Sequence, residues 1–172
     1  MPIPSSPETR LRLMTGLFLT RGDEVLLLYK TSGRVVKEVW CPAAGGHVEP
    51  EELKDPLNCV LRELKEETGL TPDFLMGLSL RYLTVRAGDG ELRQNFYYFA
   101  SPDPDRFPDD GALTSSEGVL RWFRAEELTD LPMPHSARAV LDHWLREGRH
   151  TDSLYGGIAV PEGVRFTELT RF

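Results

Sequence analysis

Residues 62–70 read RELKEETGL, and they place Glu63, Glu66 and Glu67 within five positions just before Gly69. Neighbouring carboxylates repel one another, so this spacing needs a compensating feature. The acids either form a solvated helix face or gather around a cation. The helix that carries them and the loop before it distinguish the two explanations.

A helix over residues 57–68 is the strongest periodic pattern in the chain. Asp55 can cap its first N–H groups, Pro56 is favoured at the first helical position, and Gly69 can end it in a left-handed conformation. At about 100° per residue the apolar side chains share one stripe, and the three acids share the stripe beside it. The apolar stripe comprises Leu57, Val60, Leu61 and Leu64.

Carboxylates clustered beside a buried stripe raise one another's pKa, and a bound divalent cation reverses this penalty. Oxygen ligands of this kind suit Mg²⁺, with Mn²⁺ as an alternative. The stretch GGHVEPEE, residues 45–52, adds three carboxylates and two glycines that let the backbone approach a ligand. We therefore favour a metal site over a solvated face, and we expect Glu52 to pair with Arg62.

The composition is that of an ordinary globular domain of 172 residues with 40% hydrophobic and 27% charged residues. The net charge of −7 argues against a nucleic-acid polymer or an anionic membrane as partner, but allows an anionic small molecule beside a cation. Cys41 and Cys59 lack zinc-site spacing, and the N-terminus lacks a signal peptide. We expect a reduced, cytoplasmic protein with a disordered segment over residues 1–10 and one domain over residues 11–172.

Most of the remaining pattern is typical of strands, with a second amphipathic helix near the end. This layout predicts a mixed sheet held between helices. Ser136 is expected to cap the second helix and Gly148 to end it. The expected strands cover residues 11–20, 24–30, 78–86, 92–100 and 119–123, with short strands ending at Pro42 and near residues 157–160; a short helix is expected from residue 124 and the second main helix over residues 136–148.

The acidic stretch resembles the signature of the Nudix hydrolases. That signature is Gly, five residues, Glu, seven residues, then Arg-Glu-aliphatic-x-Glu-Glu-x-Gly-aliphatic, and residues 62–70 match its second half without exception. Five residues separate Gly46 from Glu52, as in the signature, but nine rather than seven separate Glu52 from Arg62. Because Asp55-Pro56 keeps the helix start in place, the two extra residues lie in the loop. Any of three acids can then correspond to the glutamate in the first half of the signature: Glu49, Glu51 or Glu52.

The resemblance implies the Nudix fold, an α/β/α sandwich with a mixed β-sheet, and Mg²⁺-dependent hydrolysis of a nucleoside diphosphate derivative. It also implies roles around the metal for individual residues. The implied metal ligands are Glu63, Glu66, Glu67 and the carbonyl of Gly45, with Glu63 alternatively orienting water; Arg62, Glu52 and Gly46 support these ligands; Glu117 is a late acid that serves as base or ligand.

Within the family, the sequence looks most like the branch that removes damaged nucleotides, which includes 8-oxo-dGTP diphosphatases. We expect a nucleoside triphosphate to be cleaved to monophosphate and pyrophosphate. Alternatives are ADP-ribose, a dinucleoside polyphosphate or a nucleotide sugar as substrate, and a module that binds a nucleotide without hydrolysis. The sequence does not fix the oligomeric state, and a homodimer stays among the alternatives. The expected substrate contacts are Arg81 and Lys37 for phosphates, and Tyr82 and Tyr97 for the base.

Overall fold

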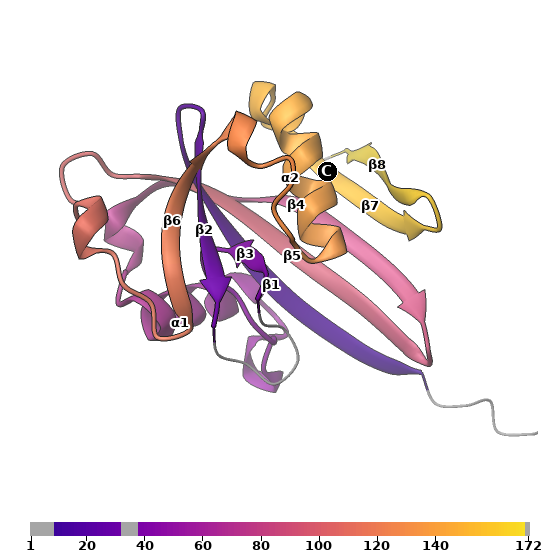
Figure 1. Ribbon diagram of the computed structural model, residues 1–172. Coiled ribbons are helices and arrows are strands. Elements are labelled where there is room, and N and C mark those ends of the chain that lie inside the picture. Colours follow the sequence, from indigo (N-terminus) through magenta and orange to yellow (C-terminus); the bar gives the residue numbers. More distant parts are fainter. Residues whose placement is uncertain (1–8, 32–37, 171–172) are drawn as a thin grey trace, which may run out of the picture.

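The computed structural model describes residues 9–31 and 38–170 and arranges them as two helices and eight strands (Figure 1). Five single 3₁₀ turns connect some of these elements. The helices are α1 (Pro56–Thr68) and α2 (His135–Arg146); the strands are β1 (Arg10–Arg21), β2 (Glu24–Lys30), β3 (Trp40–Pro42), β4 (Leu75–Gly88), β5 (Glu91–Pro102), β6 (Gly118–Arg124), β7 (Leu154–Val160) and β8 (Gly163–Leu169).

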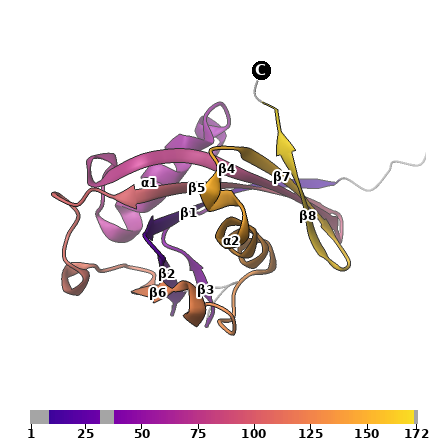
Figure 2. The ribbon, with the colours of Figure 1, turned by 90° about the horizontal axis from the view of Figure 1, so that it is seen from above.

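The strands form one mixed sheet in the order β3-β2-β1-β5-β4-β7-β8, and β6 pairs with β2. The β1–β5 and β4–β7 pairs are parallel, and the other pairs are antiparallel. Seen from above, α1 and α2 lie on opposite faces of the central strands β1, β5 and β4 (Figure 2). This arrangement confirms the expected mixed sheet between helices.

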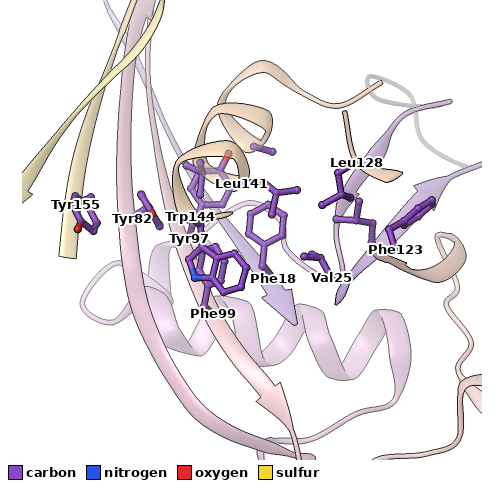
Figure 3. Packing of buried hydrophobic residues seen from close by; sticks show 13 residues of the cluster. Phe18, Val25, Tyr82, Tyr97, Phe99, Phe123, Leu128, Leu141, Trp144 and Tyr155 are labelled. Carbon is purple, nitrogen blue, oxygen red and sulfur yellow. The ribbon is translucent and has the colours of Figure 1, made fainter. Parts of the chain in front are cut away.

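The central strands are apolar on both faces because each face is covered by a helix. Alternate residues of β1 show this: Leu17 and Leu19 pack in the α1 core, whereas Phe18 packs in the α2 core. The α2 core is rich in aromatic side chains, and Figure 3 shows Phe18 beside Tyr97 and Phe99. The continuous apolar run of β1 therefore reflects two buried faces.

Helix α1 forms where its sequence signals predict. The side chain of Asp55 accepts a hydrogen bond from the backbone N–H of Leu57, and Gly69 ends the helix at a φ of 75°. Burying the apolar stripe against the sheet leaves the acidic stripe beside it, at the edge of the interface. Neither α1 nor any other helix in the described ranges is long and apolar enough to cross a bilayer.

The short helix expected from residue 124 and the expected caps of the second helix were wrong. The helix expected from residue 124 is a single 3₁₀ turn, and α2 is capped by Pro134 and Glu147. The hydroxyl of Ser136 is instead shared with that of Tyr97, so it is not a cap. The expected strand near residues 157–160 is confirmed as β7, and the sequence did not indicate β8, which returns along β7 and pairs with it.

Candidate active site

Arg62 joins helix α1 to the loop before it. Its Nε donates to Glu52 Oε1 at 2.7 Å, and its Nη2 donates to Glu52 Oε2 at 3.1 Å and to the His47 carbonyl at 3.2 Å. Glu52 is buried, and its hydrogen bonds from Arg62 lower its pKa to about 2. Among the three loop acids, Glu52 is therefore the partner of Arg62, despite the two extra residues.

Glu63 and Glu66 share the remaining terminal nitrogen of Arg62. Its Nη1 donates to Glu63 Oε1 at 2.9 Å and to Glu66 Oε2 at 3.2 Å. Glu63 is mostly covered, whereas 60% of the Glu66 side chain is exposed. A Cβ built on Gly46 would lie 2.3 Å from Glu63 Oε1, so a glycine there leaves room for this carboxylate. One guanidinium thus holds three of the four acids.

The fourth acid, Glu67, lies apart from this network. Its side chain is buried, and its Oε2 has no hydrogen-bond partner among the described residues. Burial raises the pKa of Glu67 to about 7; Lys30 opposes this shift, and the charges of Glu63 and Glu117 add to it. A buried oxygen atom without a partner carries a large desolvation penalty, which a bound cation would remove.

The loop after β3 brings backbone groups to Glu67. The amide of Thr15 donates to the Gly46 carbonyl, and the amide of Leu17 donates to the Ala44 carbonyl, both at 2.8 Å. Between them Gly45 has a φ of 146°, and a Cβ there would lie 2.2 Å from the Thr15 carbonyl oxygen. Glycine is therefore required at this position, and it places a backbone hydrogen bond from Gly45 on the carboxylate of Glu67.

A cavity of about 150 Å³ opens beside Glu67, between strands β1, β2, β3 and β5 and the start of α2. Thr15, Gly45, Lys30 and Cys41 line it together with Glu67. Its wall also includes Leu28, Met14 and Pro134, and the polar groups of Arg93, Asn95, Tyr97 and Ser136. The hydroxyls of Tyr97 and Ser136 lie 2.7 Å apart. We call this cavity the cleft.

Glu117 directly precedes β6 and lies near Glu67, which lines the cleft. Lys30 Nζ is 3.6 Å from Glu117 Oε2, and the amide of the neighbouring Ser116 donates to the Glu67 carbonyl at 2.9 Å. The expectation that a late acid comes from this segment therefore fits its position. Its role as base or ligand stays a prediction.

Two expected substrate contacts do not reach the cleft. Arg81 is buried, and its guanidinium donates to the carbonyls of Gly148, Thr151 and Ser153. Tyr82 is fully buried in the α2 core, where its hydroxyl bonds to His143 Nδ1 at 2.9 Å. We correct both assignments, because side chains held in this way do not reach a ligand in the cleft. Tyr97 does line the cleft.

Lys37, the other phosphate contact expected from the sequence, lies outside the described residues. Lys30, Asn95 and Ser136 line the cleft and were not expected from the sequence. Lys30 ends an apolar strand and resembles any surface lysine, and Ser136 resembles a helix cap. Asn95 directly precedes the aromatic run of residues 96–99, but its neighbour Gln94 is also an amide, so the sequence did not single it out.

The donor set suits a hard divalent cation in chemistry, although its side chains are not gathered around a point. No three His, Cys, Asp or Glu side chains within residues 9–31 and 38–170 converge closely enough to hold a metal ion. Glu63 and Glu66 instead bond to Nη1 of Arg62, whereas Glu67 lies outside this network. The unpartnered Glu67 oxygen is the observation that fits a cation. The two cysteines that the structure describes are both free and buried.

A mixed sheet between two helices, with an arginine-braced acidic helix facing a cleft, defines the class of hydrolases that act on phosphate anhydrides of small molecules. The chain belongs to one family of that class: residues 10–145 match the NUDIX domain model, so the protein is a Nudix hydrolase. Enzymes of this family generally use divalent metal ions and act on nucleotides.

Relatives agree with this assignment. An uncharacterized Nudix hydrolase, YvcI of Bacillus subtilis (strain 168), is 28% identical over 140 residues, which cover 80% of this chain and 82% of that protein. The mutator MutT protein of Bacillus halodurans is 26% identical with a TM-score of 0.63, over 90% of this chain and 97% of that one. A C. elegans Ap4A hydrolase, at 23% identity and a TM-score of 0.59 over 81% and 96% of the two chains, shares the fold.

Proposed function

We propose that this enzyme is a divalent-metal-dependent pyrophosphohydrolase that cleaves a nucleoside triphosphate to the monophosphate and pyrophosphate. The single observation that carries the proposal is the cleft. One end presents the buried carboxylate of Glu67, and the other end presents apolar side chains with the polar groups of Asn95, Tyr97 and Ser136. Such a site suits a molecule with an anionic end that needs a cation and a flat end that needs apolar walls.

Mg²⁺ or Mn²⁺ would be held by Glu67, Glu66, Glu63 and the carbonyl of Gly45, and it would neutralise the phosphates and activate water. Arg62 acts as a positioning residue, because it fixes Glu63 and Glu66 through its bonds to Glu52 and the loop. Lys30 contributes positive charge to the same end of the cleft, between Glu67 and Glu117.

The reaction adds the oxygen of water to phosphorus and breaks the bond between that phosphorus and the bridging oxygen, which leaves with the pyrophosphate. The water loses one proton to a carboxylate. We assign this proton to Glu117, because it lies beside Lys30 near Glu67, where the phosphates would bind. The pyrophosphate leaves carrying the electron pair of the broken bond.

The base would bind between Leu28, Pro134 and the ring of Tyr97, and Asn95 and Ser136 supply its hydrogen bonds. These side chains line the cleft, and they take the role in base binding that was expected of Tyr82 from the sequence. Discrimination by stacking and a few hydrogen bonds is worth only a few kcal/mol, so an oxidised purine would be preferred modestly over the normal one.

Metal binding is expected to stabilise the fold more strongly as the pH rises. The folded-state pKa of Glu67, about 7, exceeds its ordinary value of 4.5, so its favourable contribution is complete below 4.5 and is lost as the pH rises towards 7. A cation bound to the ionised carboxylate would remove this loss of stability. Thermal unfolding with and without millimolar Mg²⁺, at about pH 6 and about pH 8, should show the larger rise in Tm at the higher pH. Glu67→Gln is expected to abolish that pH dependence, and no rise in the unaltered protein at either pH would contradict a metal site.

The proposed substrate is tested by product analysis on a panel of compounds at equal concentration. The panel comprises dGTP, 8-oxo-dGTP, ADP-ribose, a nucleotide sugar and a dinucleoside polyphosphate. A triphosphate should give the highest kcat/KM and release pyrophosphate rather than orthophosphate. If ADP-ribose or a dinucleoside polyphosphate is preferred by tenfold or more, about 1.4 kcal/mol of transition-state binding, the substrate proposed here is wrong. Absence of hydrolysis across the panel would favour a module that only binds nucleotides.

A further inference from the structure

A second cavity, of about 160 Å³, lies directly beyond the cleft, between strands β4 and β5 and the β7–β8 hairpin. It shares Arg93, Asn95, Pro134 and Ser136 with the cleft, so the two cavities adjoin. Its outer wall comes from the hairpin, which lies beyond the residues matched by the NUDIX domain model. Figure 2 shows this hairpin beside α2, at the end of the sheet away from β2 and β6.

The strands at this cavity carry arginines in register. Arg12 of β1 pairs with Arg93 of β5, and Arg93 pairs with Arg86 of β4. Residues paired directly across strands point to the same face of a sheet, so the three guanidinium groups extend from one face. Arg93 and Arg86 both line the second cavity. We call these three residues the arginine row.

The positive charge of the row is only partly neutralised. Glu91 pairs with Arg93 at 2.9 Å and with Arg12 at 3.8 Å, so one carboxylate serves two arginines. Arg86 is exposed and has no ion pair with any described residue. Like charges placed opposite one another on a sheet destabilise it. Three arginines that share one carboxylate leave net positive charge on this face, in a chain of net charge −7, and a bound anion would balance it.

We propose that the second cavity is a phosphate-binding subsite, and that the substrate carries a second phosphate group separated from the reactive diphosphate by a nucleoside. This inference rests on the proposed function and narrows its substrate class. The guanidinium group suits phosphate because it can donate two parallel hydrogen bonds. Arg12 lies three residues along β1 from Thr15, whose carbonyl adjoins Gly45, so the backbone of Arg12 is about 10 Å from this part of the cleft. Arg93 and Arg86 extend the row sideways from there, across β5 and β4.

The experiment measures binding of product-like ligands, so it does not depend on catalysis. Affinities of the four common ribonucleoside 3′,5′-bisphosphates and of the matching 5′-monophosphates are measured by calorimetry in millimolar Mg²⁺. For at least one base, the bisphosphate should bind about tenfold more tightly, equivalent to about 1.4 kcal/mol. Arg86→Gln should bring this ratio close to one. Its exposed side chain makes no ion pair, so the variant is expected to fold.

Arg165→Gln is the matched control. Arg165 is an exposed arginine of the β7–β8 hairpin, and it pairs in register with Ile158. Its side chain therefore lies on the face of the sheet opposite to that of Gly157 and Ala159. Its loss should leave the ratio unchanged. Equal affinity of both ligands in the unaltered protein, including binding of neither, overturns the subsite. A ratio that survives Arg86→Gln, or falls equally in Arg165→Gln, also overturns it.

Inorganic phosphate distinguishes a group on the substrate from a free anion. Suppose that inorganic phosphate binds the unaltered protein, that this binding is lost in Arg86→Gln, and that the bisphosphate binds no more tightly than the monophosphate. The subsite then takes a free anion, and the proposed substrate class is wrong. The proposed function is judged separately by the hydrolysis panel. Hydrolysis without a bisphosphate preference would reject only the subsite, and a preference without hydrolysis would reject only the activity.

Discussion

Glu67→Gln is expected to lower turnover at least about 10³-fold, or about 4 kcal/mol of transition-state stabilisation, while the fold persists. Glu67 is the one acid of the α1 stripe that lines the cleft, and its Oε2 is the buried oxygen atom without a partner within the described ranges. The amide keeps the shape of the side chain but removes the charge that a divalent cation needs. Steady-state kinetics at saturating Mg²⁺ measure the loss.

The same substitution should preserve or raise the stability of the metal-free protein. A buried carboxylate with a pKa of about 7 opposes folding at neutral pH, and the amide relieves that penalty. Glu51→Gln, an exposed acid of the preceding loop, is the control and should leave both activity and stability unchanged. Near-normal turnover of Glu67→Gln at saturating Mg²⁺ would contradict the assignment of α1 as the metal-binding helix.

Glu63→Gln and Glu66→Gln are expected to lose turnover as well, but with a different effect on the rest of the site. Both carboxylates bond to Nη1 of Arg62, so each substitution also weakens the positioning network. The comparison of Glu67→Gln with these two variants therefore separates the loss of a ligand from the loss of its support.

Arg62→Ala should destabilise the fold by about 1–3 kcal/mol, since it leaves the Glu52 carboxylate without its partner. Chemical denaturation measures the change. Glu52→Gln should cost less, because the amide oxygen can still accept from Arg62. The two changes should be strongly coupled in a double-mutant cycle, whereas Arg62→Ala and Glu49→Gln should be nearly additive. Additive effects of Arg62→Ala and Glu52→Gln would remove Glu52 from this role.

The pH dependence of stability gives an independent test of the same pair. The folded-state pKa of Glu52, about 2, lies below its ordinary value of 4.5. Its contribution to stability is therefore present above 4.5 and is lost as the pH falls towards 2. Glu52→Gln should show a flatter fall in stability over that window than the unaltered protein. An identical acid profile in the two proteins would count against the ion pair.

The sequence by itself determined helix α1 and the assignment of its acids to one face. Its signals are local: Asp55, Pro56 and Gly69 fix the ends of the helix, and the spacing of its side chains fixes the two stripes. An acidic partner for Arg62 was expected from the loop, with Glu52 favoured, but the two extra residues left Glu49 and Glu51 as alternatives until the structure showed the bonds to Glu52. The match to the family signature then implied the fold.

Only the tertiary structure decided which side chains of the strands reach the cleft. Strand alternation assigns residues to two faces, but it does not say which element covers each face. In β4 it also fails locally, because the register with β5 shifts between Leu80 and Tyr82. Arg81 and Tyr82 are therefore held in the interior by partners from residues 143–153, a segment distant in the sequence.

The cleft itself depends on contacts between distant parts of the chain. Lys30, Asn95 and Ser136 come from β2, β5 and α2, and they meet because β1 pairs in parallel with β5 while α2 packs across both strands. The arginine row likewise exists only because three strands align in register. Each of these residues is an ordinary polar side chain in its local sequence. Only long-range strand pairing and helix packing bring them together, because these set positions that no local pattern encodes.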